Sequence, residues 1–425
     1  MLALAGELVS RGHAVTFLHM ADAGPLVAGR GVEFRPVGPR SHPPGTLRAV
    51  TERMARIEGF IGLGGVLRDV AAATDMLCRE LPDALRAIGA DVVVTDQTEA
   101  AGGLVAAHLG LPVVSVANAL PLNREPDVPP PFTSWTYNGS SWSRERNLGG
   151  YRVSDWLMRG HAEVIRRHAE AWRLGPRSTI EDCASPLAQV SQLVAGLDFP
   201  RKALPQTFHY CGPLRGGTSV APDFRMPEPT GAPLVYASLG TLQGSRFALF
   251  RRIAEAARRL GVRCLLAHGG GLTDEQSGRL PGRPSAYAFV PQDVVLAGAS
   301  LAVVNGGLNT VMDALARGVP VVVIPIAFEQ AAIAARLARA GAGRAVGRRF
   351  LGPGRLTRNM GEVLREPPYR EAAGRLAREI VAAGGVRHAA DIVEAVARTG
   401  RPVTREGAAA LPSSRPPRVD PGRAA

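Results

Sequence analysis

A glycine-rich turn between an apolar stretch and a helical stretch constrains the fold of this chain more than any other feature. Residues 289–330 predict a strand end, a short helix, a strand, a turn, a helix and a further strand, in that order. The turn, NGGLNT over 305–310, leads into a helix predicted over 309–317, which Asn309 or Thr310 can cap. In a doubly wound sheet such a turn presents backbone N–H groups and a helix N-terminus to an anion. The segment therefore predicts a binding site for the diphosphate of a nucleotide.

A second turn of small residues, SLGT over 238–241, follows a strand predicted over 233–238. The hydroxyl groups of Ser238 and Thr241 and the backbone around Gly240 can donate hydrogen bonds to a phosphate. Both turns follow strands in the same half of the chain, and parallel strands present their carboxyl ends at one edge of the sheet. We therefore expect the two turns to hold one diphosphate from two sides.

Side chains near the first turn offer groups for the rest of a nucleotide sugar. The ring of Phe289 can stack on a nucleobase whose edge the backbone of Val290 reads, or it can be an ordinary core phenylalanine. Asp313 lies one helical turn beyond Asn309, so its carboxylate can accept hydrogen bonds from ribose hydroxyls or can be a solvated helix position. The pattern leaves both alternatives open for each residue.

Further candidates lie at the carboxyl ends of other predicted strands. Glu329 and Gln330 follow the apolar strand predicted over 319–326, and they can hold sugar hydroxyls or cap the next helix. Asp96 ends a strand predicted over 91–96 in the first half. It can polarise a histidine base, or it can be a loop-entry or capping aspartate.

Alternating predicted helices and strands indicate an α/β protein with two doubly wound parallel sheets. We expect a first domain over 1–211, a linker over 212–232, a second domain over 233–399 and a disordered tail over 400–425. The first domain opens with a helix, so we expect it to lack the first strand of its sheet. A start codon placed too far downstream accounts for this, as does a truncated protein. Residues 118–150, rich in Pro, Asn, Ser and Trp, predict a long loop beside a substrate pocket.

Composition argues against several other classes of protein. The net charge of +13 comes almost wholly from arginine, with Lys202 the only lysine, and no nucleic-acid recognition motif accompanies it. The four cysteines are far apart, and no His/Cys cluster predicts a metal site. No apolar run approaches the ~20 residues that span a bilayer, and no signal peptide is visible. We therefore expect a cytoplasmic protein.

With these residues in view, the chain resembles family 1 glycosyltransferases, which use UDP-sugars. Residues 289–330 match the donor-binding signature of that family. Within the family the chain is similar to the bacterial zeaxanthin glucosyltransferases of carotenoid biosynthesis, from Leu2 to about Arg398. The stretches that carry this closer resemblance are SHPPG (41–45), TDMLCRELP (74–82), ALPLNREPD (119–127), DWLMRGH (155–161), SPLAQVSQLV (185–194), LDFPRKALP (197–205), YASLGTLQG (236–244) and LLAHGGGL (265–272). The resemblance implies a GT-B fold, in which two Rossmann-like domains face each other across a cleft.

The resemblance also implies roles for individual residues. Phe289 would stack on uracil, with Val290 and Gln292 contacting the uridine. Asp313 takes the place of a ribose-binding glutamate. Asp96 aligns with the aspartate that pairs with the catalytic histidine.

For the diphosphate and the sugar, the implied contacts come from the turn and from the strand end that follows it. Gly307, Asn309 and Thr310 would hold the diphosphate. Glu329 and Gln330 would hold the sugar hydroxyls. The complete set of predicted donor-binding residues is Ser238, Gly240, Thr241, Phe289, Val290, Gln292, Asn305, Gly306, Gly307, Asn309, Thr310, Asp313, Glu329 and Gln330.

Two departures from the family pattern affect catalysis. The family signature has a histidine before the glycine turn, where this chain has Asn305, which can donate a hydrogen bond but carries no charge. We expect stabilisation of the leaving group to weaken by ~1–2 kcal/mol. The general-base histidine of the family lies in the loop after the first strand, which we expect this chain to lack. No residue of this chain is therefore assigned that role.

The implied activity is inverting transfer of glucose from UDP-glucose to a hydroxyl of a carotenoid such as zeaxanthin, with no metal or other cofactor. Because carotenoids reside in membranes, we expect peripheral contact with the inner face of the membrane, helped by the basic surface. A UDP-sugar-dependent transferase acting on a polyketide, macrolide or sterol is one alternative. A UDP-sugar-binding protein with impaired catalysis is another. A nicotinamide-dependent oxidoreductase is disfavoured, because the GxGxxG fingerprint of that class is not seen.

Overall fold

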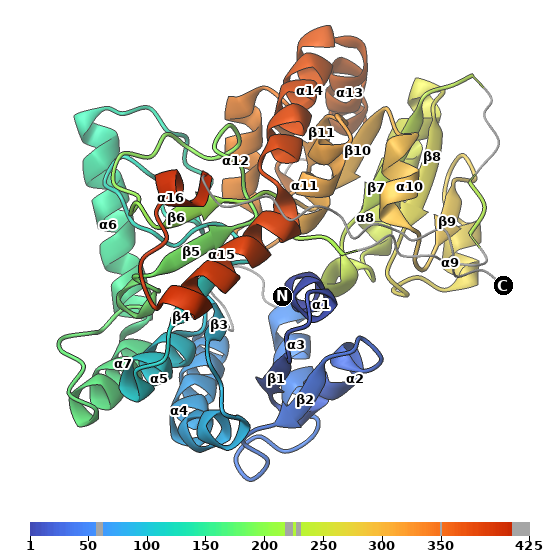
Figure 1. The fold of residues 1–425 in the computed structure, drawn as a ribbon. Coiled ribbons are helices and arrows are strands. Elements are labelled where there is room, and N and C mark those ends of the chain that lie inside the picture. The colour runs from blue at the N-terminus through green and yellow to red at the C-terminus, as the bar shows by residue number, and fades with distance from the viewer. Residues whose placement is uncertain (57–62, 217–223, 227–230, 349–350, 410–425) are drawn as a thin grey trace, which may run out of the picture.

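The computed structural model describes residues 1–56, 63–216, 224–226, 231–348 and 351–409. These residues form two α/β halves, and Figure 1 follows the chain through them from blue to red. The strands of each half pair in parallel, as the alternating pattern predicts. In the described ranges, no helix combines the length and the apolar composition needed to cross a bilayer.

The second half is built on a six-stranded parallel sheet in the order β12-β11-β10-β7-β8-β9. Its strands are β7 (Leu234–Ser238), β8 (Arg263–Ala267), β9 (Ser285–Tyr287), β10 (Leu301–Val304), β11 (Val321–Val323) and β12 (Gly343–Ala345). The chain order reverses between β7 and β10, which pair directly. At such a reversal a doubly wound sheet opens a crevice at the carboxyl ends of its strands. Both predicted glycine turns follow these two central strands.

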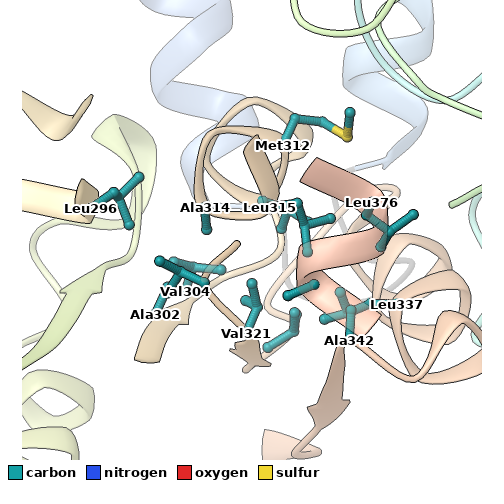
Figure 2. Close-up of a cluster of buried hydrophobic side chains, with 14 of the residues drawn as sticks. Leu296, Ala302, Val304, Met312, Ala314, Leu315, Val321, Leu337, Ala342 and Leu376 are labelled. Carbon is teal, nitrogen blue, oxygen red and sulfur yellow. The ribbon is translucent and has the colours of Figure 1, made fainter. Parts of the chain in front are cut away.

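Helices cover both faces of this sheet, because successive strand residues point to opposite sides. They are α8 (Phe247–Leu260), α9 (Asp274–Gly278), α10 (Gln292–Ala297), α11 (Leu308–Ala316), α12 (Gln330–Ala340), α13 (Pro353–Arg365) and α14 (Pro367–Ala382). Side chains of α8 and α13 form one buried cluster with Val303 and Val322. Side chains of α10, α11, α12 and α14 form another with Val304 and Val321. Figure 2 shows the second cluster, in which Leu337 of α12 lies beside the strands.

The first half contains a four-stranded parallel sheet in the order β3-β4-β5-β6 and a separate two-stranded sheet of β1 and β2. The strands are β1 (Thr16–His19), β2 (Glu33–Pro36), β3 (Val93–Asp96), β4 (Val113–Ala117), β5 (Ala188–Ser191) and β6 (Phe208–Tyr210). The helices before β6 are α1 (Leu2–Ser10), α2 (Gly24–Val27), α3 (Thr46–Arg56), α4 (Leu63–Ile88), α5 (Ala100–Leu109), α6 (Ser141–Leu157) and α7 (Arg159–Ala171). Within the described ranges no strand joins β1 to β3, so the parallel sheet of this half is divided in two.

Two expectations about the first half were wrong. Residues 118–150 are not one long loop, because Ser140 caps α6 by accepting a hydrogen bond from the N–H of Ser143. The amphipathic pattern of residues 154–174 also predicts one helix, whereas the structure has the end of α6 followed by α7, and the two helices meet at Met158. Ser140 is a favourable N-cap residue and marks the start of α6, but the surrounding Pro, Asn and Ser residues made the segment resemble a loop.

The helix that ends the second half of the sequence packs on the first half of the structure. α15 (Gly385–Thr399) crosses back, and Figure 1 shows it lying over β4 and β5. Its residues Ile392 and Val396 share a buried cluster with Leu4 of α1 and Val114 of β4. The prediction extends the second domain to residue 399, whereas α15 packs on the first half.

The tail predicted over 400–425 is ordered in its first part. α16 (Arg405–Ala409) forms there, and the N–H of Val403 donates a hydrogen bond to the carbonyl of Leu187 at 2.9 Å. These contacts fasten the segment to the edge of the first-half sheet. Residues 410–425 lie outside the described ranges, so the prediction of disorder there stays a prediction.

A buried carboxylate joins the two halves. The side chain of Asp198, which follows β5, is 0% exposed, and it accepts a hydrogen bond from Nε of Arg336 on α12 at 2.8 Å. It also accepts from Nε of Arg201 and from the hydroxyl of Tyr210, each at 2.9 Å. The guanidinium of Arg336 lies 4.3 Å from the ring centre of Phe199. Two arginines thus compensate one carboxylate that would otherwise be costly to bury.

Replacing Asp198 with alanine should lower the free energy of unfolding by about 3–5 kcal/mol, because Arg336 would stay buried without its counter-ion and Arg201 would keep only Glu125, at 3.8 Å. Urea unfolding followed by tryptophan fluorescence measures this loss. Glu163→Ala is the matched control, since Glu163 forms an exposed ion pair with Arg166 whose loss costs less than about 1 kcal/mol. Equal losses in the two variants would show that the buried carboxylate stabilises no more than a surface pair.

The stabilisation by the Asp198 carboxylate has a defined pH dependence. Burial alone would raise the pKa of Asp198, but Arg201 and Arg336 more than offset it and hold the pKa below its ordinary value of 3.8. The stabilisation is therefore complete above that value and is lost as the pH falls through the lowered pKa. The stability difference between the wild type and Asp198→Asn should stay constant at neutral and mildly acidic pH and disappear only under strongly acidic conditions.

Candidate active site

The two glycine turns lie next to each other at the carboxyl edge of the six-stranded sheet. Ser238, the last residue of β7, pairs with Val304, the last residue of β10. A Cβ atom added to Gly240 would lie 3.4 Å from Nδ2 of Asn305, so the backbone of one turn is in contact with the side chain of the other. The predicted proximity of the turns is confirmed. That they bind a diphosphate stays a prediction.

The turn over 305–310 requires glycine at one position. Gly306 has a φ of +92°, and an added Cβ atom would lie 2.7 Å from Cγ1 of Val323 and 3.1 Å from the carbonyl oxygen of Gln330. A side chain there would be strained and would clash. Oδ1 of Asn305 also accepts a hydrogen bond from the N–H of Gly307 at 3.2 Å. These contacts fix the turn against β11 and the start of α12.

The helix after this turn begins one residue earlier than predicted. α11 begins at Leu308 with Gly307 as its N-cap, and no described side chain caps it. The expectation that Asn309 or Thr310 caps the helix is therefore wrong, because both lie inside its first turn. The N–H groups of a first turn need partners from outside the helix, and here the N-terminus lies at the same edge as the two turns.

The carboxylate of Asp313 is oriented by two side chains. Its Oδ1 accepts from Nε of Arg215 and its Oδ2 accepts from Nε2 of Gln292, each at 2.7 Å. Oε1 of Gln292 accepts in turn from the hydroxyl of Tyr236 at 3.0 Å. Arg215 also donates to the carbonyl and to Oδ1 of Asn309, at 3.1 and 3.3 Å. Each oxygen of Asp313 retains a further lone pair, so the carboxylate can still accept from the hydroxyls of a ligand.

Two residues that no sequence pattern singles out, Arg215 and Gln192, connect this site to the first half. Nη1 of Arg215 donates to Oε1 of Gln192 at 2.9 Å, and Nε2 of Gln192 donates to Oδ1 of Asn118 at 3.3 Å. Nδ2 of Asn118 donates to Oδ2 of Asp96 at 2.6 Å. A chain of hydrogen bonds therefore runs from Asp96 in the first half, through the start of the linker, to Asp313 in the second. No sequence signal marks Arg215, because its partners lie far away along the chain and only folding brings them together.

Asp96 lies at the end of β3, as predicted. Its side chain accepts hydrogen bonds from the N–H and the hydroxyl of Thr98 at 2.8 and 2.6 Å. These bonds fix the start of the loop after β3, as the loop-entry alternative predicts. The capping alternative is wrong, because Glu99 is the N-cap of α5 and its side chain accepts from the N–H of Ala101. In the described part of the chain the hydrogen bonds to Asp96 come from Thr98 and Asn118 and not from a histidine.

Phe289 lies beyond the end of β9 and is 69% exposed. The alternative that it is a core phenylalanine is therefore wrong. Its neighbour Val290 packs against the buried cluster that α10 and α11 share. An exposed ring on an anchored backbone is available to stack on a planar ligand.

Glu329 and Gln330 lie where α12 begins. Glu329 is the N-cap residue, but its side chain makes no capping hydrogen bond within the described ranges, so the capping alternative is wrong for it. Burial raises the pKa of the Glu329 carboxyl above its ordinary value of 4.5. Oε1 of Gln330 accepts from the N–H groups of Ile326 and Ala327 at 2.8 and 3.0 Å. Gln330 therefore fixes the loop before α12, beside the half-buried carboxyl group of Glu329.

The parts of the chain that the structure describes contain no group of three or more His, Cys, Asp or Glu side chains placed to hold a metal ion. The four cysteines are free thiols, and burial raises the pKa of the Cys264 thiol to about 12.

Comparisons with known proteins agree with this fold. Residues 270–396 match the family model described as "Erythromycin biosynthesis protein CIII-like, C-terminal domain". The zeaxanthin glucosyltransferase of Pantoea ananas is 43% identical over 406 residues, which cover 94% of this chain and 93% of that protein. The zeaxanthin glucosyltransferase of Pseudescherichia vulneris is 39% identical over 399 residues, which cover 92% and 93%. The crystal structure of CalG4, the calicheamicin glycosyltransferase, matches with a TM-score of 0.75 at 23% identity and covers 94% of each chain. The chain therefore belongs to the glycosyltransferase family that includes the zeaxanthin glucosyltransferases, and it has the GT-B fold typical of enzymes that use nucleotide-sugar donors.

Proposed function

We propose that this chain transfers glucose from UDP-glucose to a hydroxyl of a carotenoid such as zeaxanthin, with inversion at the anomeric carbon. The observation that carries the proposal is the identity to two zeaxanthin glucosyltransferases along almost the whole chain. The geometry supports it, because the predicted donor residues follow neighbouring strands at one edge of one sheet.

The order of the strands supports one orientation of the donor. Along the edge, Phe289 follows β9, the two turns follow β7 and β10, and Glu329 follows β11. Uracil would stack on Phe289, the ribose would lie at Asp313, the diphosphate at the turns and glucose at Glu329 and Gln330. Four strand spacings of ~4.8 Å give about 19 Å, which is the length scale of an extended nucleotide sugar.

The proposed reaction is a direct displacement. A general base takes the proton of the acceptor hydroxyl, the oxygen attacks the anomeric carbon, and the bond from that carbon to UDP breaks. Negative charge then grows on the diphosphate, where the N-terminus of α11 and the amide of Asn305 would stabilise it. Asn305 supplies a dipole and not a charge. Asp96 would orient the base, which we assign to no residue of this chain.

Two other functions remain candidates. The matching family model is named for erythromycin biosynthesis, which favours a transferase acting on a polyketide, macrolide or sterol with the same donor site. A UDP-sugar-binding protein with impaired catalysis is favoured by the hydrogen bonds of Asp96, which among the described residues come from Thr98 and Asn118.

Purified protein given UDP-glucose and zeaxanthin in liposomes should form zeaxanthin glucosides, detected by liquid chromatography and mass spectrometry. Asp313→Ala should form about tenfold less product at subsaturating donor, because hydrogen bonds to a charged group contribute about 1.5–3 kcal/mol. Arg166→Gln, a change in an exposed ion pair, should have no effect. Product from a macrolide aglycone but not from zeaxanthin would identify the second candidate. UDP-glucose binding without product from any acceptor would identify the third.

Arg215→Gln should weaken UDP binding and reduce the preference for ribose, because Arg215 holds the Asp313 carboxylate in place. Isothermal titration calorimetry with UDP and 2′-deoxy-UDP measures that preference. The wild type should prefer UDP by about tenfold or more, and the variant by a smaller factor. Arg166→Gln removes the same charge from an exposed site and should leave the preference unchanged. A preference that survives in Arg215→Gln but is lost in Asp313→Ala would show that Asp313 binds ribose without Arg215.

The preference of the site for UDP-glucose over UDP should fall in mildly acidic solution. An ionised Glu329 accepts hydrogen bonds from sugar hydroxyls, and protonation removes that capacity. Because burial raises the pKa of Glu329, the loss should begin above the ordinary value of 4.5, where other glutamates are still ionised. Glu329→Gln should give a lower ratio of affinities that does not change with pH. A wild-type ratio that is constant over this range would contradict the role of Glu329.

A further inference from the structure

One face of α6 exposes large apolar side chains to solvent. Trp142 is 67% exposed, Trp156 is 63% exposed and Val153 is 53% exposed. Val153 and Trp156 lie about three and four helical turns beyond Trp142, so all three share one side of the helix. Figure 1 shows α6 at the outer edge of the first half. Tryptophans gathered on one exposed helix face mark a surface that meets something other than water.

This exposure does not result from loose packing, because the opposite side of α6 is anchored. Asn147 and Tyr151 are buried. Nδ2 of Asn147 donates to the carbonyl of Pro126 at 2.9 Å, and the hydroxyl of Tyr151 donates to the carbonyl of Val128 at 3.0 Å. The helix is thus held in a fixed orientation with its tryptophans directed outward.

Arginines accompany the exposed rings. The guanidinium of Arg146 lies 5.3 Å from the ring centre of Trp142, and that of Arg159 lies 4.7 Å from the ring centre of Trp156. Arg152 is exposed between them along the helix. Tryptophan with adjacent arginine suits the membrane interface, where the ring enters the headgroup region and the cation meets lipid phosphate.

The charge of this surface favours anionic lipid over a second copy of the chain. α6 carries three arginines and two acidic residues, and one of the acids, Asp155, is paired with Arg124 from outside the helix. The whole chain has a net charge of +13. Two such surfaces would repel each other, whereas an anionic bilayer attracts one.

We propose that the outer face of α6 docks this protein on an anionic membrane surface, with Trp142 and Trp156 inserted at the level of the headgroups. The docking surface consists of exposed residues of α6. Only the biological role of docking rests on the proposed function: it would give the enzyme access to a carotenoid dissolved in the bilayer. No helix in the described ranges crosses a membrane, so contact at the surface is the way in which these residues would meet lipid.

Cosedimentation of the full chain with vesicles of phosphatidylcholine and phosphatidylglycerol tests the proposal. The wild type should bind, and binding should weaken with added salt. The double variant Trp142→Ala/Trp156→Ala should bind about tenfold or more weakly. Trp172→Phe is the matched control and should bind as the wild type does, because Trp172 is half-buried and stacks on His108 at 4.5 Å. No wild-type binding, or equal binding by the double variant, overturns the proposal.

Further measurements separate membrane docking from misfolding and from self-association. The double variant should keep the thermal midpoint and the UDP affinity of the wild type. Brominated lipids should quench the tryptophan fluorescence of the wild type. This measurement needs no variant, and absence of quenching would overturn the proposed insertion of the tryptophans. A dimer in analytical ultracentrifugation that the double variant abolishes would make this face a subunit interface and overturn the proposal. If the protein binds vesicles but transfers no glucose, only the proposed function is overturned. If it transfers glucose in detergent micelles but does not bind vesicles, only the docking proposal is overturned.

Discussion

The arrangement of the two halves depends on the buried carboxylate of Asp198. An ionised carboxylate at that depth is stable only if its charge is compensated, and Arg336 on α12 brings that compensation from the other half. The same helix begins at Gln330, directly after Glu329, and Gln330 borders the glycine turn at Gly306. Leu197 joins the apolar cluster of α12 and α14, so the ion pair lies within a continuous core. The element that anchors the first half therefore also positions the proposed sugar site.

A second connection between the halves is of a different kind. Arg215 links Gln192 to Asp313, but its side chain is 37% exposed, so solvent screens its charge interactions. The Asp198 junction is buried, whereas the Arg215 junction is partly exposed, so its hydrogen bonds can be exchanged for contacts with a bound nucleotide at small cost. A GT-B enzyme needs both properties, because its halves must stay together while the cleft between them admits and releases a donor.

The remaining surface features fit an acceptor that is poorly soluble in water. α15 returns to the first half and closes one face of its sheet, while α6 stands at the outer edge with two tryptophans exposed. The two glycine turns lie on the other half, at the carboxyl edge of the six-stranded sheet. Under the proposed function, such a division would place the charged, water-soluble donor at one half and the apolar acceptor at the other.

Local signals in the sequence determined much of this protein. Apolar runs ending in glycine predicted β7, β10 and the turns after them, because a strand followed by a left-handed glycine is specified by neighbouring residues alone. The side-by-side placement of the turns followed from the alternating pattern, since doubly wound sheets have few topologies. Only the tertiary structure decided where α15 packs, which cation faces Asp198 and how Arg215 reaches Asp313. Those contacts join residues far apart in the chain, and the free energy that selects them comes from burial and charge compensation, which no local pattern records.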